Sequence, residues 1–427
     1  MAYREALYKI LFISHKLLSF HLISKASLSE EEIMLTVRKV TSFAFAFYNF
    51  VGIKLFQWDN DDKLTKRQKY TLILTLIIFV MNFICKFSCF ILRKYEDAQE
   101  FTKLIAYFGF ASNGVVKMLS VWLGRKTLHE VIKDLEKNFP RTSNELHEFK
   151  YYEHYAFVKR HMYLLSILHW TISIVFMLFP IVQSTFEYLA NLNGDGKFIP
   201  RFPYIMVYPF DHRKPAGFAF AYITQLIGGV TIHSYFCGSD SLLLATVHLV
   251  NMQFDSLALR IRKFKTQGYK KDLQELKQII KIHISAHENA ERVNDVFNIS
   301  ILLNYLISIA VLVMIGVQVI TGTELWDLSK FVGFLVSCIS QVYYVCFYGS
   351  LLLDYSSKIG EELMNQEWYL ADNRYQRMVI LVIARSQRPA HLTAYKFFII
   401  SMESFSNLMT TAYQFFTLIK ARMEEEN

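Results

Sequence analysis

Two histidines in the sequence have the spacing of a metal-binding pair. His283 and His287 lie four residues apart in a stretch rich in Leu, Ile, Lys and Glu, so a helix would place both imidazoles on one face, as a zinc site needs. A third ligand would have to come from elsewhere, such as Glu288 or Glu291. The simpler interpretation is the polar face of an ordinary helix. We therefore predict no metal and no other cofactor.

Enzyme chemistry has no comparable support. The sequence contains no glycine-rich phosphate loop, no Gly-x-Ser-x-Gly elbow and no Cys-x-x-Cys pair, which are the arrangements that position phosphates, nucleophiles or redox thiols. All five cysteines lie in apolar stretches, where free Cys behaves as a small buried hydrophobe. We predict that the protein is not an enzyme and has no disulfide framework.

Three charged residues interrupt otherwise apolar segments. Ionisable side chains inside a membrane are costly and are usually functional or paired. Lys86 and Lys117 each lie toward one end of an apolar run, from where a long side chain can snorkel to the interface. We interpret both as structural anchors. For Glu403 two interpretations stay open: pairing with a basic group, or attraction of ions at a water-filled vestibule.

The last apolar segment carries a polar stripe. Thr410, Gln414 and Thr417 follow one another at spacings of four and three, which places them on one face of a helix. A polar face on a spanning helix needs either another helix or water. If several copies meet around an axis, Thr410 and Gln414 line a pore, and Leu418 forms a hydrophobic gate. Ordinary hydrogen bonding between helices is the alternative.

Aromatic and small polar residues crowd the preceding apolar segments. Small ligands are held by apolar pockets with a few polar anchors. Any one of these side chains is more readily explained as packing, but as a group they predict a ligand pocket in the outer half. Depth in the segment and side-chain type favour Tyr107, Phe108, Trp170, Ser173, Tyr222, Phe334 and Gln341.

The elements that must position these residues are membrane helices. Of 427 residues, 53% are hydrophobic and 19% are charged, and the mean hydropathy is +0.23, whereas soluble domains carry about 25% charged residues. About 20 apolar residues cross a bilayer, and the runs are continuous rather than alternating, which disfavours a β-barrel. We predict an all-α membrane protein with seven transmembrane helices, at residues 71–92, 104–123, 162–186, 216–239, 298–323, 331–353 and 397–419.

Basic residues give the predicted orientation. Lys and Arg concentrate in residues 1–70, 124–161, 251–297 and 354–393 and are sparse in the alternate loops. The positive-inside rule then places the N terminus in the cytoplasm and the C terminus outside the cell. The absence of a signal-peptide pattern at the start agrees with this orientation. The net charge of +9 is divided among loops, so nucleic acid is not an expected partner.

The predicted organisation follows from these segments. Residues 251–297 have apolar residues at helical spacing between charged ones, which indicates a cytoplasmic helical extension. Pro389 should end a short helix at about 372–387. The expected regions are a cytoplasmic N-terminal region (1–70), transmembrane helices one to six with the outer pocket (71–353), a cytoplasmic anchor (354–393), a pore-lining helix (394–420) and an extracellular tail (421–427).

One loop carries a distinctive motif. Residues 201–211, Arg-Phe-Pro-Tyr-Ile-Met-Val-Tyr-Pro-Phe-Asp, are followed by Tyr222-x-x-Gln225. Together they resemble the second outer loop, which forms a lid, of a known family, the insect odorant receptors. Val207 stands where the family usually has a tryptophan.

Motifs nearer the C terminus resemble the same family, in the same order. Phe347-Tyr-Gly349 is similar to the family's sixth helix, and Ala384-Arg-Ser-Gln-Arg-Pro389 to its short cytoplasmic helix. The run Ala412-Tyr-Gln-Phe-Phe-Thr-Leu-Ile-Lys420 resembles the end of the family's last helix. The resemblance covers about residues 70–422.

The resemblance implies an odorant-gated, non-selective cation channel. In that family an odorant-specific subunit binds a small volatile ligand and joins a shared olfactory co-receptor in a heterotetramer in the plasma membrane of sensory dendrites. Four final helices surround the pore. The chain resembles the odorant-specific type, because it lacks the co-receptor's long cytoplasmic insertion. A metabotropic seven-helix chemoreceptor, a gustatory-type ligand-gated channel and a small-molecule transporter are the alternatives.

Overall fold

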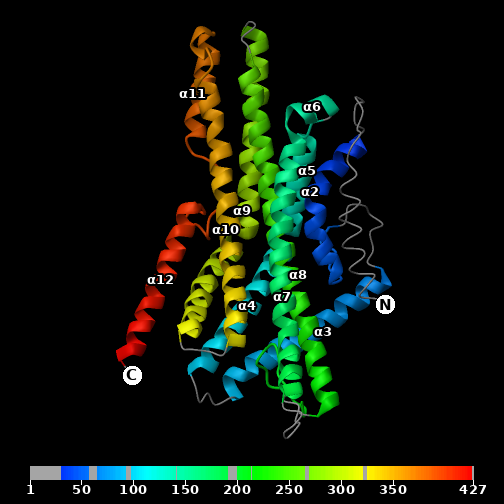
Figure 1. Cartoon of the computed structure of the whole chain (residues 1–427). Coiled ribbons are helices and arrows are strands. Elements are labelled where there is room, and N and C mark those ends of the chain that lie inside the picture. The colour runs from blue at the N-terminus through cyan, green and yellow to red at the C-terminus, as the bar shows by residue number, and fades with distance from the viewer. Residues whose placement is uncertain are drawn as a thin grey trace.

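The protein is described by a computed structural model over residues 30–56, 65–92, 98–140, 142–190, 200–212, 214–264, 269–320 and 325–425. These residues are almost wholly helical (Figure 1), and an isolated antiparallel bridge joins Thr393 to Ile399. The helices are α2 (Glu30–Phe50), α3 (Lys66–Leu92), α4 (Ala98–Leu123), α5 (Arg125–Lys137), α6 (Ser143–Glu148), α7 (Tyr151–Ala190), α8 (Pro215–Lys263), α9 (Tyr269–Ile320), α10 (Leu325–Met364), a 3-10 turn η1 (Trp368–Leu370), α11 (Asn373–Ser386) and α12 (Met402–Glu425).

Six of these helices are long and apolar enough to cross a membrane: α3, α4, α7, α8, α9 and α10. They coincide with the first six predicted spans, except that residues 321–323 of the fifth lie outside the described residues, and the all-α membrane fold is confirmed. The seventh predicted span falls on α12, which has 24 residues. Its polar residues Asn407, Thr410 and Gln414 lower its hydropathy, so α12 does not stand among the six apolar spans.

Helix α8 forms the centre of the bundle. Every residue from 231 to 250 is buried, and α8 contacts α2, α3, α4, α7, α9 and α10. A helix that is enclosed on all sides has no lipid-facing stripe to keep apolar. This explains how α8 holds polar residues such as Asp240 and Asn251 within its most buried stretch.

The helical extension predicted at residues 251–297 is built by two helices. α8 continues to Lys263 and α9 begins at Tyr269, so the two form an antiparallel pair that reaches the end of the molecule drawn at the top of Figure 1. α11 lies at the same end, beside α10. It occupies nearly the predicted range, and the Asp372 carboxylate caps its first turn by accepting from the Arg374 N–H at 2.9 Å.

The N-terminal region contains a helix that the sequence interpretation did not predict. Val40, Ala44 and Tyr48 of α2 are buried in the main core, and α2 packs against α8. Part of the predicted region 1–70 is therefore a component of the bundle. Residues 1–29 lie outside the described residues.

The predicted boundaries of the last helix were wrong. The helix begins at Met402 instead of 394–397 and continues to Glu425, so most of the predicted tail is helical. A tight hairpin precedes it, because Tyr395 and Lys396 have positive φ angles of 48° and 65°, which reverse the chain. The Ile400 N–H donates to the Leu392 carbonyl at 2.9 Å and closes the hairpin.

Candidate functional site: a lid over a buried cavity

The segment between α7 and α8 forms a lid, defined here as residues 200–212, at the end of the bundle opposite α11. Gln225 of α8 holds it in place. Its Oε1 accepts from the Tyr204 N–H at 3.0 Å, and its Nε2 donates to the Tyr204 carbonyl at 3.1 Å and to the Tyr208 hydroxyl at 2.9 Å. Burial raises the pKa of Tyr208 to about 12, so this hydroxyl stays protonated. The buried Gln225 amide therefore holds the lid at two residues, Tyr204 and Tyr208.

Further contacts fix the lid to its neighbours. Arg201 forms an ion pair with Glu187 of α7 at 2.9 Å. The Val207 N–H donates to the Cys85 carbonyl of α3 at 3.4 Å. Phe202 and other lid side chains pack around a small apolar cluster that includes Cys85. The lid therefore bridges α3, α7 and α8.

A narrow cavity lies beneath the lid. Its volume is only about 10 Å³, roughly the space that one water molecule needs. The walls come from α3, α4, α8 and the lid, and they are mostly apolar. The lining residues are Phe79, Asn82, Phe83, Lys86, Ala111, Tyr204, Met206, Gln225, Gly228, Gly229 and Ile232.

Two polar side chains of α3 reach this cavity. Lys86 is 4% exposed, and its Nζ lies 4.0 Å from the centroid of the Tyr204 ring. It has no hydrogen-bond acceptor and no carboxylate partner in the part of the chain that the structure describes. Asn82 donates from Nδ2 to the Thr224 carbonyl at 2.7 Å. Its buried Oδ1 has no partner among the described residues.

Two of the seven residues predicted to bind ligand lie next to the cavity walls. The Tyr107 ring packs edge-on against Tyr204, with centroids 5.7 Å apart. The Phe108 ring lies 5.3 Å from that of Phe83. Both belong to α4, and they form a layer directly behind residues that line the cavity.

Three other predicted residues lie along α7 and α8. Trp170 is near Phe47 and His233, with ring centroids 6.5 and 6.4 Å apart. The Ser173 hydroxyl is buried and faces the Met177 sulfur at 3.9 Å. The Tyr222 hydroxyl donates to the Met177 carbonyl. Met177, which contacts two of these residues, also approaches Gly229 in the cavity wall through its side chain.

The remaining two predicted residues belong to α10. Phe334 packs edge-on against Phe110 with centroids 4.9 Å apart. Gln341 donates to Asp240 Oδ2 at 2.8 Å. The seven residues thus fall into two groups. Some surround the cavity, and others belong to a polar centre around Asp240. None of them lines the cavity itself.

That polar centre contains the second buried lysine. Lys117 is 2% exposed and forms an ion pair with the other oxygen of Asp240, Oδ1. The pair joins α4 to α8, and Gln341 extends it to α10. Both lysines are enclosed by neighbouring helices, which the possibility of snorkelling did not anticipate, and the interpretation of both as structural anchors stays a prediction.

The predicted pore residues occupy the outward face of α12. Thr410 and Gln414 are exposed and Leu418 is 62% exposed. The opposite face, with buried Leu408 and Ala412, packs against the bundle, where α12 contacts α9 and α10. In Figure 1 the C-terminal part of α12 stands away from the other helices.

The histidine pair is buried instead of lying on a polar surface. His283 and His287 are 2% and 5% exposed, and their Nε2 atoms lie 3.1 Å apart, so one ring donates a hydrogen bond to the other. Glu288 and Glu291 are exposed and do not join them. Among the described residues no group of three metal-ligating side chains occurs.

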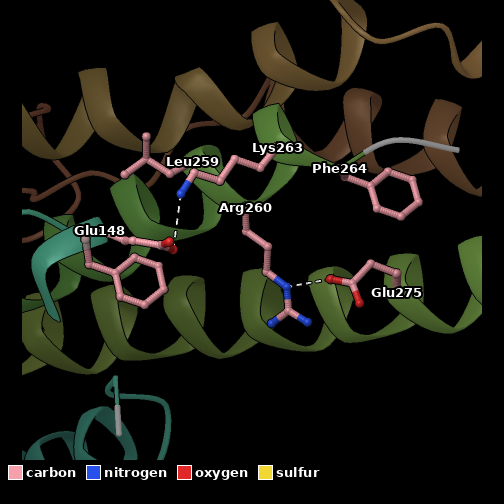
Figure 2. Close-up of a pocket in the computed structure, with 7 residues that line it drawn as sticks. Glu148, Leu259, Arg260, Lys263, Phe264 and Glu275 are labelled. Carbon is pink, nitrogen blue, oxygen red and sulfur yellow. Dashed lines mark hydrogen bonds and ion pairs between the residues drawn. The ribbon is translucent and has the colours of Figure 1, made fainter. Parts of the chain in front are cut away.

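A larger groove lies at the far end of the molecule, between α6, α8 and α9. Its empty volume is about 610 Å³, which includes space open to solvent. Its charged groups are already paired, as Figure 2 shows: Arg260 with Glu275 at 2.6 Å and Lys263 with Glu148 at 3.1 Å. We therefore regard it as a junction between helices and not as a ligand site.

Sequence reasoning missed the residues that line the cavity. A usable signal was present on the first span, where Asn82 precedes Lys86 by four residues, so that both fall on one helix face. Another was the Gly228-Gly229 pair within the fourth span, because glycine in a membrane helix permits close approach. The contribution of the first span to the cavity depends on tertiary packing, which no local pattern shows.

The architecture defines the class of the protein. A bundle of apolar helices, a lid over a narrow cavity and a polar terminal helix on the periphery are the features of a multi-pass membrane protein. A solved structure with this fold is the insect olfactory receptor OR5 from Machilis hrabei in complex with eugenol. It superimposes with a TM-score of 0.73 at 14% identity, and the match covers 91% of this chain and 99% of that one.

Sequence comparison identifies the family. The 7tm odorant receptor family model matches residues 97–413, so the chain belongs to the 7tm odorant receptor family. Odorant receptor 85b of Drosophila melanogaster is 28% identical over 391 residues, which cover 90% of this chain and 99% of that receptor. Odorant receptor 85c of the same species is 28% identical over 393 residues, covering 90% and 98%. The predicted resemblance is thereby confirmed.

Proposed function

We propose that the chain is the odorant-specific subunit of an odorant-gated, non-selective cation channel in the plasma membrane. A small volatile ligand binds in the outer half, and the open pore is formed together with a shared co-receptor in a heterotetramer. In this proposal the N terminus is cytoplasmic, α12 lines the pore, and the end of the molecule that contains α11 is the cytoplasmic anchor.

The observation that carries the channel proposal is the outward face of α12. The helix is attached to its own chain by Leu408 and Ala412, while Thr410, Gln414 and Leu418 face away. A polar row on a spanning helix is stable only against water or another helix. At a central axis shared with other subunits, this polar row faces both water and the neighbouring helices. Leu418 of each subunit then forms an apolar ring that closes the pore by dewetting.

The cavity beneath the lid supports the ligand half of the proposal. Binding that favours one of two conformations shifts their equilibrium. The Machilis hrabei receptor was solved in complex with eugenol, which supports a small organic ligand for this fold. Tyr107 and Phe108 stay our ligand-pocket predictions nearest the cavity, and Trp170, Ser173, Tyr222, Phe334 and Gln341 are predicted to shape the surrounding pocket.

Voltage-clamp recording tests the proposal directly. Cells that express the chain with an olfactory co-receptor should give cation currents to some members of a broad odorant panel, and cells that express either subunit alone define the background. Currents should persist in excised patches without nucleotide. A requirement for nucleotide and G proteins, with the N terminus accessible on intact cells, would instead establish a metabotropic receptor.

The pore assignment has its own test. Leu418→Ala should raise ligand-free current or change the permeability ratios, because it removes apolar bulk from the proposed gate. Tyr413→Ala is the matched control, since Tyr413 is also exposed on α12 but lies off the Thr410–Gln414–Leu418 row. If both variants conduct like the unmodified channel, Leu418 does not line the pore.

A further inference from the structure

The cavity beneath the lid contains two polar groups whose bonding capacity is unused. Lys86 is more than nine-tenths buried and has only the face of the Tyr204 ring against its Nζ. Asn82 Oδ1 is buried without a donor among the described residues. Gln225, which also lines the cavity, has both ends of its amide satisfied by the lid. Lys86 and Asn82 Oδ1 therefore retain bonding capacity that Gln225 does not.

Such groups call for a partner because their burial is costly. A buried amine without an acceptor and a buried carbonyl without a donor each lose their hydrogen bonds to water without replacement. A stacked cation and ring recover only part of this loss. The second buried lysine, Lys117, shows the alternative arrangement, in which a carboxylate from the same chain supplies the missing bonds.

We propose that Lys86 and Asn82 form the polar end of a site for hydroxyl-bearing volatiles, namely small alcohols and phenols. The two side chains are four residues apart on α3, so they are neighbours on one helix face, with Cβ atoms about 5–6 Å apart. One oxygen atom placed between them can contact both. This inference rests on the proposed function of the chain as an odorant-gated channel subunit.

The donor and acceptor inventory selects the hydroxyl group. Lys86 offers only N–H donors, whereas Asn82 Oδ1 is an acceptor. A hydroxyl oxygen accepts from Lys86, and its hydrogen is donated to Asn82. An ether or ketone satisfies Lys86 alone. A carboxylate pairs with the Lys86 charge but brings no hydrogen for Asn82.

The walls match the chemistry of the rest of such a ligand, and the space of about 10 Å³ must widen to admit it. Phe79, Phe83 and Ile232 offer apolar and aromatic surface around the polar end. Gly228 leaves room for the Asn82 side chain, because a Cβ at position 228 would lie 2.5 Å from Asn82 Nδ2. The space is narrow, and Met206 of the lid is its most adaptable wall, since an unbranched thioether side chain repacks easily.

The test compares benzyl alcohol with its isomer anisole, which has the same atoms but no O–H. In cells expressing the chain and the co-receptor, the half-maximal concentration should be about tenfold lower for benzyl alcohol, because only its hydroxyl can donate to the buried Asn82 carbonyl oxygen. Asn82→Leu should bring the ratio close to one. Lys86→Met should raise the half-maximal concentration of both compounds and also reduce the ratio, because the hydroxyl loses the donor that holds it beside Asn82. Lys69→Met, an exposed lysine on the same helix, should keep the preference.

A second measurement separates this inference from the channel proposal. Purified chain in detergent should show a larger rise in unfolding temperature with benzyl alcohol than with anisole, and Lys86→Met should reduce the difference. If no volatile evokes current but this difference is present, the channel proposal fails and the hydroxyl site stands. A preference that survives in both Lys86→Met and Asn82→Leu overturns the site. So does a stronger response to benzoate that depends on Lys86 alone.

Discussion

The surroundings of Lys86 and of Lys117 differ in one decisive respect. Both lysines interrupt apolar spans and both are almost completely buried. Lys117 has Asp240 as a partner, and Gln341 binds the second oxygen of that carboxylate at 2.8 Å. Lys86 has an aromatic face at 4.0 Å and no carboxylate among the described residues.

The difference separates a structural charge from a charge available to a ligand. A buried ion pair with additional hydrogen bonds is complete without any outside molecule, and breaking it leaves an uncompensated charge. A buried lysine beside an empty space and an unsatisfied amide is complete only when something else binds. The paired Lys117 therefore holds helices together, whereas the unpaired Lys86 is suited to binding a ligand.

The largest expected effect is the loss of one member of the Lys117–Asp240 pair. Lys117→Met or Asp240→Leu alone should lower the free energy of unfolding by about 3–5 kcal/mol, because each leaves a buried charge unpaired. Thermal unfolding in detergent and surface expression measure this. The double variant should recover part of the loss. Single variants as stable as the unmodified chain would contradict the structural role of the pair.

Removing the attachment of the lid should have the next largest effect. Gln225→Leu deletes three hydrogen bonds between α8 and the lid, worth about 0.5–1.5 kcal/mol each. Amide hydrogen exchange across residues 200–212 should become faster by about one to two orders of magnitude. Exchange in α11, which lies at the other end of the molecule, is the internal control. Unchanged lid exchange would show that other contacts hold it.

A smaller effect is expected from filling the α8 wall near the cavity. A Cβ at Gly229 would lie 2.0 Å from Met177 Cε, whereas at Gly333 of α10 the nearest atom is 3.5 Å away. Gly229→Ala should therefore displace the flexible end of Met177 at a cost of about 1 kcal/mol of stability, the low end of overpacking, and should shift odorant dose responses. Gly333→Ala should do neither. Equal behaviour of the two variants would mean that Met177 relocates freely.

The smallest expected change is in the stability of Lys86→Met. Removing an unpaired buried amine relieves a desolvation cost and gives up a cation–π contact of about 0.5–2 kcal/mol. These terms oppose each other, so the unfolding free energy should change by less than about 1 kcal/mol. The measurement is the same unfolding assay as for Lys117. A loss as large as that of Lys117→Met would erase the distinction between the two lysines.

Much of the fold was accessible from the sequence because membrane spans are a local property. Six apolar runs coincide with helices that meet the requirement for crossing a bilayer. The α11 range was predicted closely because Pro389 ends a helix by local chemistry. In contrast, α2 has charged residues in its first half and aromatic residues in its second half, and only its packing against α8 makes it part of the bundle.

The site was less accessible because its defining contacts are non-local. Lys117 and Asp240 are 123 residues apart in the chain, and no spacing rule connects them. The same holds for Gln225 and the lid residue Tyr204, which belong to different elements. The seven predicted ligand residues were chosen by side-chain type, which identifies aromatic layers around a cavity but not which span supplies its wall.

The complete enclosure of α8 has a consequence for how receptors of this shape diversify. A substitution on that helix disturbs several neighbouring helices at once, so few changes there are tolerated. Phe79 and Phe83 of α3, together with Met206 of the lid, are only half-buried and can vary at little cost to folding. New odour preferences in this architecture should therefore arise chiefly from the first span and the lid, while α8 serves as the invariant frame.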